Sequence, residues 1–166
     1  EHEKQMQALE LIPEIAAEFK AGFQRDSGGL VRGYRLEDAD TVVVAMGSVL
    51  GTIKDTIDEM RDAGVKIGVL GVISFRPFPL EAVRAALKNA KRVVVVEKTF
   101  AVGIGGILAT DIRTAMDGIA IRDYTVVAGL GGRPITRKSL REVFNKATFD
   151  ELPALTVPIT VQLIAG

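Results

Sequence analysis

Four short runs of apolar, mostly β-branched residues, each followed by a helical pattern, constrain the fold of this chain more than any other feature. The runs cover residues 41–46, 65–72, 92–97 and 124–128. They are apolar without alternation, so both faces of each strand are expected to be covered, which is typical of parallel strands joined by crossover helices. The pattern therefore predicts an α/β fold, built as a three-layer α/β/α sandwich.

The segments between and before these runs predict five helices and one further strand. An amphipathic helix is expected over residues 3–24, where Pro13 should either kink the helix or mark a restart. After a polar, Gly-rich loop, residues 30–36 are predicted to form a short strand. The other four helices are predicted from apolar stripes: Val49, Ile53, Ile57 and Met60; Leu80, Val83, Ala86 and Leu87; Leu108, Ile112 and Met116; Leu140, Val143 and Phe144.

The composition excludes several kinds of chemistry and of partner. The 166 residues hold 21 Lys and Arg against 21 Asp and Glu, which gives no electrostatic signal for nucleic acid or an anionic membrane. Without Cys there is no thiolate nucleophile and no Cys-ligated iron–sulfur cluster. The single His, His2, provides neither a Ser-His-Asp arrangement nor a metal site. No stretch reaches the roughly 18 apolar residues of a membrane span, and no secretory signal is visible, so a cytoplasmic location is expected.

The last residues break the strand and helix alternation and set the expected domain organisation. Two prolines interrupt an apolar stretch there and favour extended chain over helix. We therefore expect one α/β domain over residues 1–147 and an apolar, extended tail over residues 148–166. A tail this apolar is expected either to pack on its own domain or to dock on a neighbouring domain or subunit.

Gly-rich loops follow the predicted strands at the edge where helix N-termini offer free N–H groups to anions. In the first loop, Ser48 is predicted to cap the next helix, with phosphate binding as the alternative. The second loop carries Gly103, Gly105 and Gly106, but the spacing matches neither a dinucleotide fingerprint nor a Walker sequence. Close packing of the backbone against a neighbour is therefore favoured over a nucleotide site.

Two arginines in these loops are candidates for contacts with an anion or a partner. Arg133, in the loop over residues 129–136, is expected either to hold an anion or a partner carboxylate, or to form a surface salt bridge. Thr136 is predicted to cap the last helix. Arg76 belongs to a rigid turn that contains two prolines, and it is expected to be available for a neighbour.

Glu97 is a carboxylate at the end of a buried strand, and two interpretations remain open for it. It is either a tuned acid or base, or, as we favour, the partner of Lys98 or Lys91 in a structural ion pair. No catalytic residue is assigned.

In order along the chain, these segments resemble the domain that follows the pyrimidine-binding domain in pyruvate (2-oxoacid):ferredoxin oxidoreductases. This domain has the transketolase carboxy-terminal-like fold, and the resemblance covers about residues 2–147. Besides the amino-terminal helix, the matching motifs are GYRLEDAD at 33–40, VAMGS at 44–48 with Gly51 and Thr52, FRPFP at 75–79, VVEK at 95–98, GIGG at 103–106, and GLGGR at 129–133 with Ile135 and Thr136.

The resemblance implies a five-stranded, mostly parallel sheet of order 1-3-2-4-5, in which the first strand, residues 30–36, is antiparallel. The second and fourth strands are then neighbours whose chain continues in opposite directions. Such a switch point places a crevice between Gly47 and Ser48 on one side and Lys98 to Gly103 on the other.

The resemblance also implies the chemistry of the parent enzyme. There, thiamine diphosphate attacks the 2-oxoacid, carbon dioxide leaves, electrons pass through iron–sulfur clusters to ferredoxin, and coenzyme A takes the acyl group. No G-D-G diphosphate motif, which would accompany magnesium, is present here, so no cofactor is assigned to this chain. The expected partners are the thiamine-binding domains and iron–sulfur subunits of the same enzyme, with ferredoxin served indirectly.

The leading interpretation is therefore a non-catalytic, structural domain of such an oxidoreductase, inactive as an isolated chain. Two alternatives stay open. The first is a free-standing regulatory module that binds a nucleotide or coenzyme A at the strand-end crevice. The second is the equivalent domain of a transketolase or 2-oxoacid dehydrogenase, against which the GLGGR motif speaks.

Overall fold

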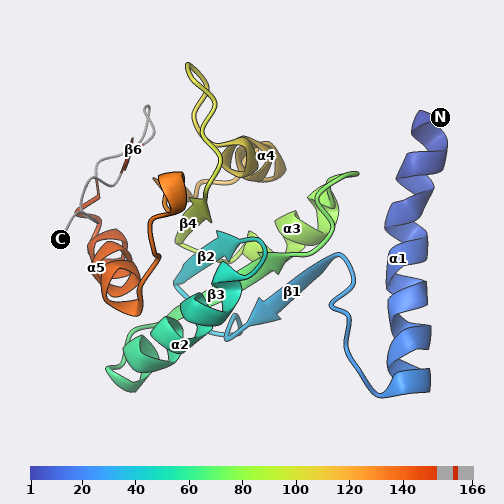
Figure 1. Ribbon diagram of the computed structural model, residues 1–166, viewed down its shortest axis with the longest axis horizontal. Helices are drawn as coiled ribbons and strands as arrows, with labels where there is room; N and C mark the ends of the chain where they lie inside the picture. The colour runs from blue at the N-terminus through green and yellow to red at the C-terminus, as the bar shows by residue number, and fades with distance from the viewer. Residues whose placement is uncertain (153–158, 161–166) are drawn as a thin grey trace.

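The computed structural model describes residues 1–152 and 159–160, which form one mixed sheet with helices on both faces (Figure 1). The strands are β1 (Val31–Tyr34), β2 (Thr41–Ala45), β3 (Ile67–Val72), β4 (Arg92–Glu97), β5 (Arg122–Val127) and β6 (Ile159–Thr160). The helices are α1 (His2–Phe23), α2 (Val49–Asp62), α3 (Leu80–Leu87), α4 (Ile107–Ala115) and α5 (Arg137–Thr148), with a short 3₁₀ turn at Leu130–Gly132.

The strand order confirms the expected topology. The sheet runs β1-β3-β2-β4-β5-β6, with β1 antiparallel to β3 and every other pairing parallel. The first five strands thus have the predicted order, and the two-residue strand β6, which was not predicted, pairs with β5 at the edge of the sheet.

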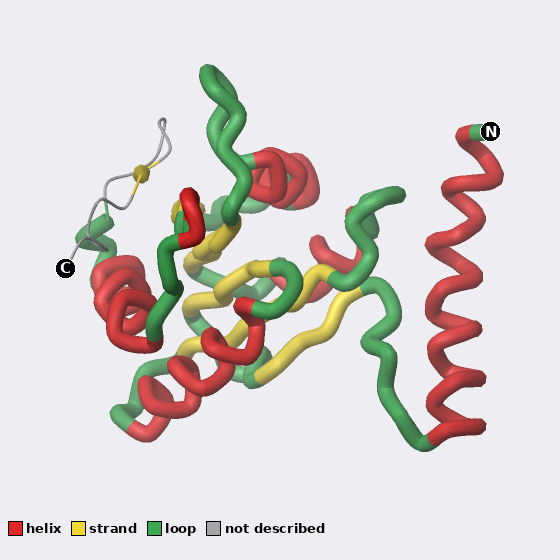
Figure 2. Tube along the Cα trace, viewed as in Figure 1, coloured by secondary structure: helices red, strands yellow, loops and turns green. Residues whose placement is uncertain are grey.

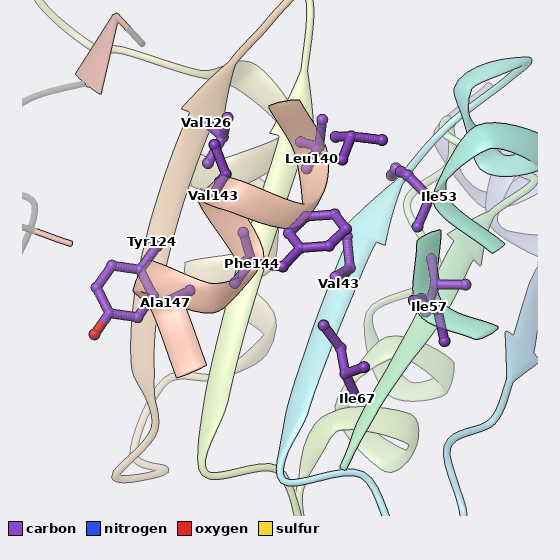
Figure 3. Close-up of a cluster of buried hydrophobic side chains, with 14 of the residues drawn as sticks. Val43, Ile53, Ile57, Ile67, Tyr124, Val126, Leu140, Val143, Phe144 and Ala147 are labelled. Atoms are coloured by element: carbon purple, nitrogen blue, oxygen red, sulfur yellow. The ribbon is translucent and has the colours of Figure 1, made fainter. Parts of the chain in front are cut away.

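Two apolar clusters, one on each face of the sheet, confirm the three-layer arrangement. Successive side chains of a strand point to opposite faces, and in β2 Val43 and Ala45 join one cluster while Val42 and Val44 join the other. Helices α2 and α5 cover the first face, where Phe144 is fully buried among strand residues (Figure 3). Helices α3 and α4 cover the second face.

Helix α1 lies at the side of the domain and buries none of its residues (Figure 1). It runs through Pro13 as one helix, which excludes a restart at this residue. Several of its large apolar side chains fall on one stripe and stay exposed, namely Leu11, Ile15, Phe19 and Phe23, whereas Leu9 and Ile12 are half-buried. The pattern of residues 3–24 therefore predicts the helix correctly, although the packing partner that such a stripe normally requires is not among the described residues.

A cluster of ion pairs and hydrogen bonds around Asp150, just after α5, connects the end of this helix to the beginnings of β4 and β5. The carboxylate of Asp150 accepts two hydrogen bonds of 2.7 Å from Arg92 and one of 2.9 Å from the hydroxyl of Tyr124. Arg122 pairs with it at 2.9 Å. The hydrogen bonds from Arg92 above all, followed by those from Tyr124 and Arg122, hold the pKa of Asp150 far below its usual value.

Two parts of the predicted tail can be placed: residues 148–152, and the two residues of β6, which pair with β5. Leu152 is buried in the first cluster, beside α5. For residues 153–158 and 161–166, which lie outside the described residues, the choice between packing on this domain and docking elsewhere stays a prediction. Within the described part of the chain, no helix combines the length and the apolar character that crossing a membrane requires.

Candidate functional site

A cavity of about 410 Å³ opens at the carboxyl edge of the sheet, where the neighbouring parallel strands β2 and β4 end. After β2 the chain passes to α2 on one face, and after β4 it passes to α4 on the other. The two connections diverge at this point and leave a crevice, as the switch-point rule requires. The lining residues are Met46, Gly47, Ser48, Val49, Phe75, Val96, Glu97, Lys98, Thr99, Ile107, Leu108 and Ile135.

Of the candidate ligand or interface residues, Ser48 and Lys98 line this cavity, as do Gly47 and Glu97, which the sequence also singled out. The other candidates, Arg76, Gly103, Gly105, Gly106 and Arg133, are not among the lining residues. Most of the wall is instead apolar and comes from strand ends and first helical turns, such as Val96 and Ile107. The sequence offered no separate signal for these wall residues, because their apolar pattern is accounted for by the core.

The carboxylate of Glu97 caps the N-terminus of α4. Its Oε2 accepts a hydrogen bond from the backbone N–H of Leu108 at 2.9 Å, and its Oε1 accepts one from Ala109 at 3.0 Å. The predicted ion pair with Lys98 or Lys91 is wrong, since Lys91 pairs with Asp40 at 3.0 Å and no described cation contacts Glu97. The N–H groups that a phosphate would use at this helix are therefore occupied by an internal carboxylate.

Position 106 requires a glycine because the capping carboxylate of Glu97 occupies the space of a Cβ atom, and not because of the backbone conformation of this residue. Its φ of −75° and ψ of 141° are open to any residue. However, a Cβ atom at position 106 would overlap the Oε1 atom of Glu97. The close packing favoured from the sequence thus accounts for Gly106, and its neighbour is a buried carboxylate.

Gly103 and Gly105 shape a loop that projects from the sheet between β4 and α4 (Figure 2). Both have positive φ angles, 85° and 94°, which glycine adopts without strain. The loop is closed by two hydrogen bonds of 2.8 Å between the backbones of Ala101 and Gly105. At its tip the side chains of Val102 and Ile104 are 90% and 70% exposed, which makes this loop an apolar protrusion.

The two helix caps predicted from hydroxyl residues have opposite outcomes. Thr136 caps α5 as expected, in a reciprocal capping box with Ser139. Ser48 precedes α2, but its side chain makes no capping hydrogen bond, so that prediction is wrong. The hydroxyl of Ser48 is left exposed at the rim of the cavity.

The two candidate arginines differ in how far they are already engaged. Arg76 forms an ion pair of 2.9 Å with Asp111 and lies 4.0 Å from the ring centre of Phe75, yet its side chain is 53% exposed, so its contact with a neighbour stays a prediction. Arg133 is exposed and forms no ion pair among the described residues. The same is true of Lys98. The described residues also contain no group of His, Asp and Glu side chains that could hold a metal ion.

Comparison with known proteins identifies the family. The family model for pyruvate:ferredoxin oxidoreductase core domain II matches residues 39–140. The pyruvate synthase subunit PorA of Methanosarcina barkeri is 45% identical over 151 residues, which are 87% of this chain and 37% of that subunit. The chain therefore spans little more than a third of the length of this relative.

Two solved structures share the fold at low sequence identity. A 2-oxoglutarate:ferredoxin oxidoreductase from Magnetococcus marinus, solved with 2-oxoglutarate, coenzyme A and succinyl-CoA bound, matches with a TM-score of 0.58 and 21% identity, over 79% of this chain and 21% of that one. A split-gene transketolase, described as an inactive β4 tetramer, matches with a TM-score of 0.53 and 19% identity, over 71% of this chain and 41% of that one. The family match and these folds agree with each other, and the chain belongs to the family of pyruvate:ferredoxin oxidoreductase core domain II.

Proposed function

We propose that this chain is a structural domain of a 2-oxoacid:ferredoxin oxidoreductase and that it supplies no catalytic residue. In the parent reaction, a 2-oxoacid is oxidatively decarboxylated to an acyl-CoA while ferredoxin is reduced. This domain would pack against the thiamine-binding domains and the iron–sulfur subunits and help to hold them together.

The occupied N-terminus of α4 is the observation that carries this proposal. In open α/β sheets, a ligand binds at the carboxyl edge through helix N-termini. Here the carboxylate of Glu97 takes the N–H groups of Leu108 and Ala109. These N–H groups therefore stabilise the fold and are not available to a ligand.

The described residues do not fit a thiamine diphosphate site. Magnesium bound to a diphosphate prefers carboxylate and other oxygen ligands that converge on one point. The one carboxylate among the described residues that line the carboxyl-edge cavity, that of Glu97, is already bonded to the backbone of α4. Thiamine diphosphate, magnesium and iron–sulfur clusters are accordingly assigned to other parts of the parent enzyme, where coenzyme A would also react.

Exposed apolar surfaces support the assembly role. The stripe on α1 leaves Ile15 and Phe23 59% and 67% exposed, and the loop tip leaves Val102 90% exposed. Contiguous apolar surface on a domain usually marks contact with another protein surface. The match covers 37% of the length of PorA from Methanosarcina barkeri, so a parent enzyme of this kind would contain further domains for these surfaces to contact.

Coexpression with the remaining chains of a pyruvate synthase tests the proposal. This chain should coelute with them in size-exclusion chromatography, and the double substitution Phe19→Glu and Phe23→Glu on α1 should abolish coelution. Glu14→Gln, on the opposite, charged face of α1, is the matched control and should leave it intact. Decarboxylation of pyruvate by the isolated chain, supplied with thiamine diphosphate, magnesium and methyl viologen as electron acceptor, would refute the proposal.

A further inference from the structure

We infer that the cavity between the ends of β2 and β4 binds a monocarboxylate with an apolar chain. The chain of the ligand lies along the apolar walls, and its carboxylate lies at the rim beside Lys98 and Ser48. This inference goes beyond the assembly role proposed above, because packing between domains requires no small ligand.

The walls of the cavity set the apolar part of the ligand. The side chains of Met46, Val49, Phe75, Ile107 and Ile135 line it, together with the buried residues Val96 and Leu108. A volume of about 410 Å³ falls in the range of small-molecule sites. Because these walls offer few polar groups, they favour an aliphatic chain over a sugar or a nucleoside.

The charge at the rim indicates which polar group the ligand carries. Lys98 is the one basic residue among the described residues that line the cavity, and no described carboxylate pairs with it. Gly129 makes room for its stem, since a Cβ atom at position 129 would lie 2.8 Å from the Cε of Lys98. The hydroxyl of Ser48 makes no hydrogen bond among the described residues, and it lies where α2 begins, at the positive end of the helix dipole. The ammonium of Lys98 and the hydroxyl groups of Ser48 and of Thr99, which also lines the cavity, suit a single carboxylate.

A phosphate group fits this cavity poorly. The N–H groups at the start of α4, which would bind a phosphate, already bond the carboxylate of Glu97. Glu97 also lines the cavity, and its charge repels a dianion about twice as strongly as a monoanion at the same distance. The described side-chain donors at the rim are those of Lys98, Ser48 and Thr99, with a single cation among them, which favours a monoanion over a nucleotide.

Titration of the ¹⁵N-labelled chain with octanoate tests the inference by NMR. The amide signals of Gly47, Ser48 and Lys98 should shift in a saturable manner, while octylamine and inorganic phosphate should leave them in place. Affinity should rise three- to fourfold for each methylene from butanoate to octanoate, since burial of a CH₂ group contributes about 0.8 kcal/mol.

Two variants separate the charge contact from non-specific apolar binding. Lys98→Gln should weaken octanoate binding about fivefold, as expected for loss of a partly exposed ion pair. Arg133→Gln removes another exposed cation, which has no ion pair in the described part of the chain and does not line the cavity, and it should leave the affinity unchanged. Equal binding of octanoate and octylamine, or shifts confined to Val102 and Ile104 at the loop tip, would overturn the inference. So would the absence of any saturable shift.

Discussion

The contact between Glu97 and Gly106 predicts a strong energetic coupling between the two positions. Glu97→Ala removes two charge-assisted hydrogen bonds and leaves the N–H groups of Leu108 and Ala109 without their acceptor. Each hydrogen bond to a charged group contributes about 1.5–3 kcal/mol, and a carboxylate at a helix N-terminus adds a few tenths more. Because the cavity admits water that compensates in part, we expect the free energy of unfolding to fall by about 3 kcal/mol.

Gly106→Ala is expected to change sign between the two backgrounds. With Glu97 present, the new Cβ atom overlaps its Oε1 atom and displaces the carboxylate, which should cost about 2 kcal/mol, as overpacking does. With Glu97→Ala, the space is free, and the extended backbone of residue 106 accepts alanine without strain. Gly106→Ala should then stabilise the chain by about 0.5 kcal/mol, because it restricts the unfolded state. The expected coupling is about 2.5 kcal/mol.

Urea denaturation followed by far-ultraviolet circular dichroism measures all four members of this cycle. Gly51→Ala is the matched control, because Gly51 lies in α2 and a Cβ atom there meets no other atom within 4 Å. It should stabilise the chain by about 0.5–1 kcal/mol in both backgrounds. If Gly106→Ala costs the same with and without Glu97, the carboxylate does not occupy the space beside Gly106, and the cap described here is wrong.

Three further predictions concern the rest of the fold. Phe144→Ala should lower the free energy of unfolding in urea by about 3–5 kcal/mol, because this ring is fully buried. Thr136→Ala should lower it by about 1 kcal/mol through loss of the capping box of α5. The depressed pKa of Asp150 contributes stability that is present above the unfolded-state value near 3.8 and is lost as the pH falls below it. Asp150→Asn should therefore flatten the acid side of a plot of stability against pH, whereas Asp62→Asn, at a position without an ion pair in the described chain, should not.

The strands and helices of the sheet follow from the sequence because burial on two faces leaves an unambiguous pattern. The four apolar runs predict β2, β3, β4 and β5, and the stripes beside them predict the four helices that cover the sheet. The family resemblance supplied the strand order, which periodicity alone does not contain. The short strand β6 has no such signal, since two residues are too few to show a period.

The predictions for single polar side chains were less successful, for a physical reason that Glu97 and Ser48 illustrate. The role of a polar group depends on which donors and acceptors lie within about 3 Å. Glu97 bonds to residues 11 and 12 positions ahead, across a loop whose path the sequence does not specify. Ser48 stands at a correctly predicted helix start, yet its hydroxyl is not used for a cap.

The sequence by itself therefore determined the layers, the elements and the edge at which the loops gather, because these depend on the period and length of apolar segments. Only the tertiary structure decided what that edge contains. Placing β4 beside β2 opens an apolar cavity with Lys98 and Ser48 at its rim, and the turn after β4 brings the N–H groups of α4 to the carboxylate of Glu97. Both are consequences of distances between residues remote in the chain, which no local pattern encodes.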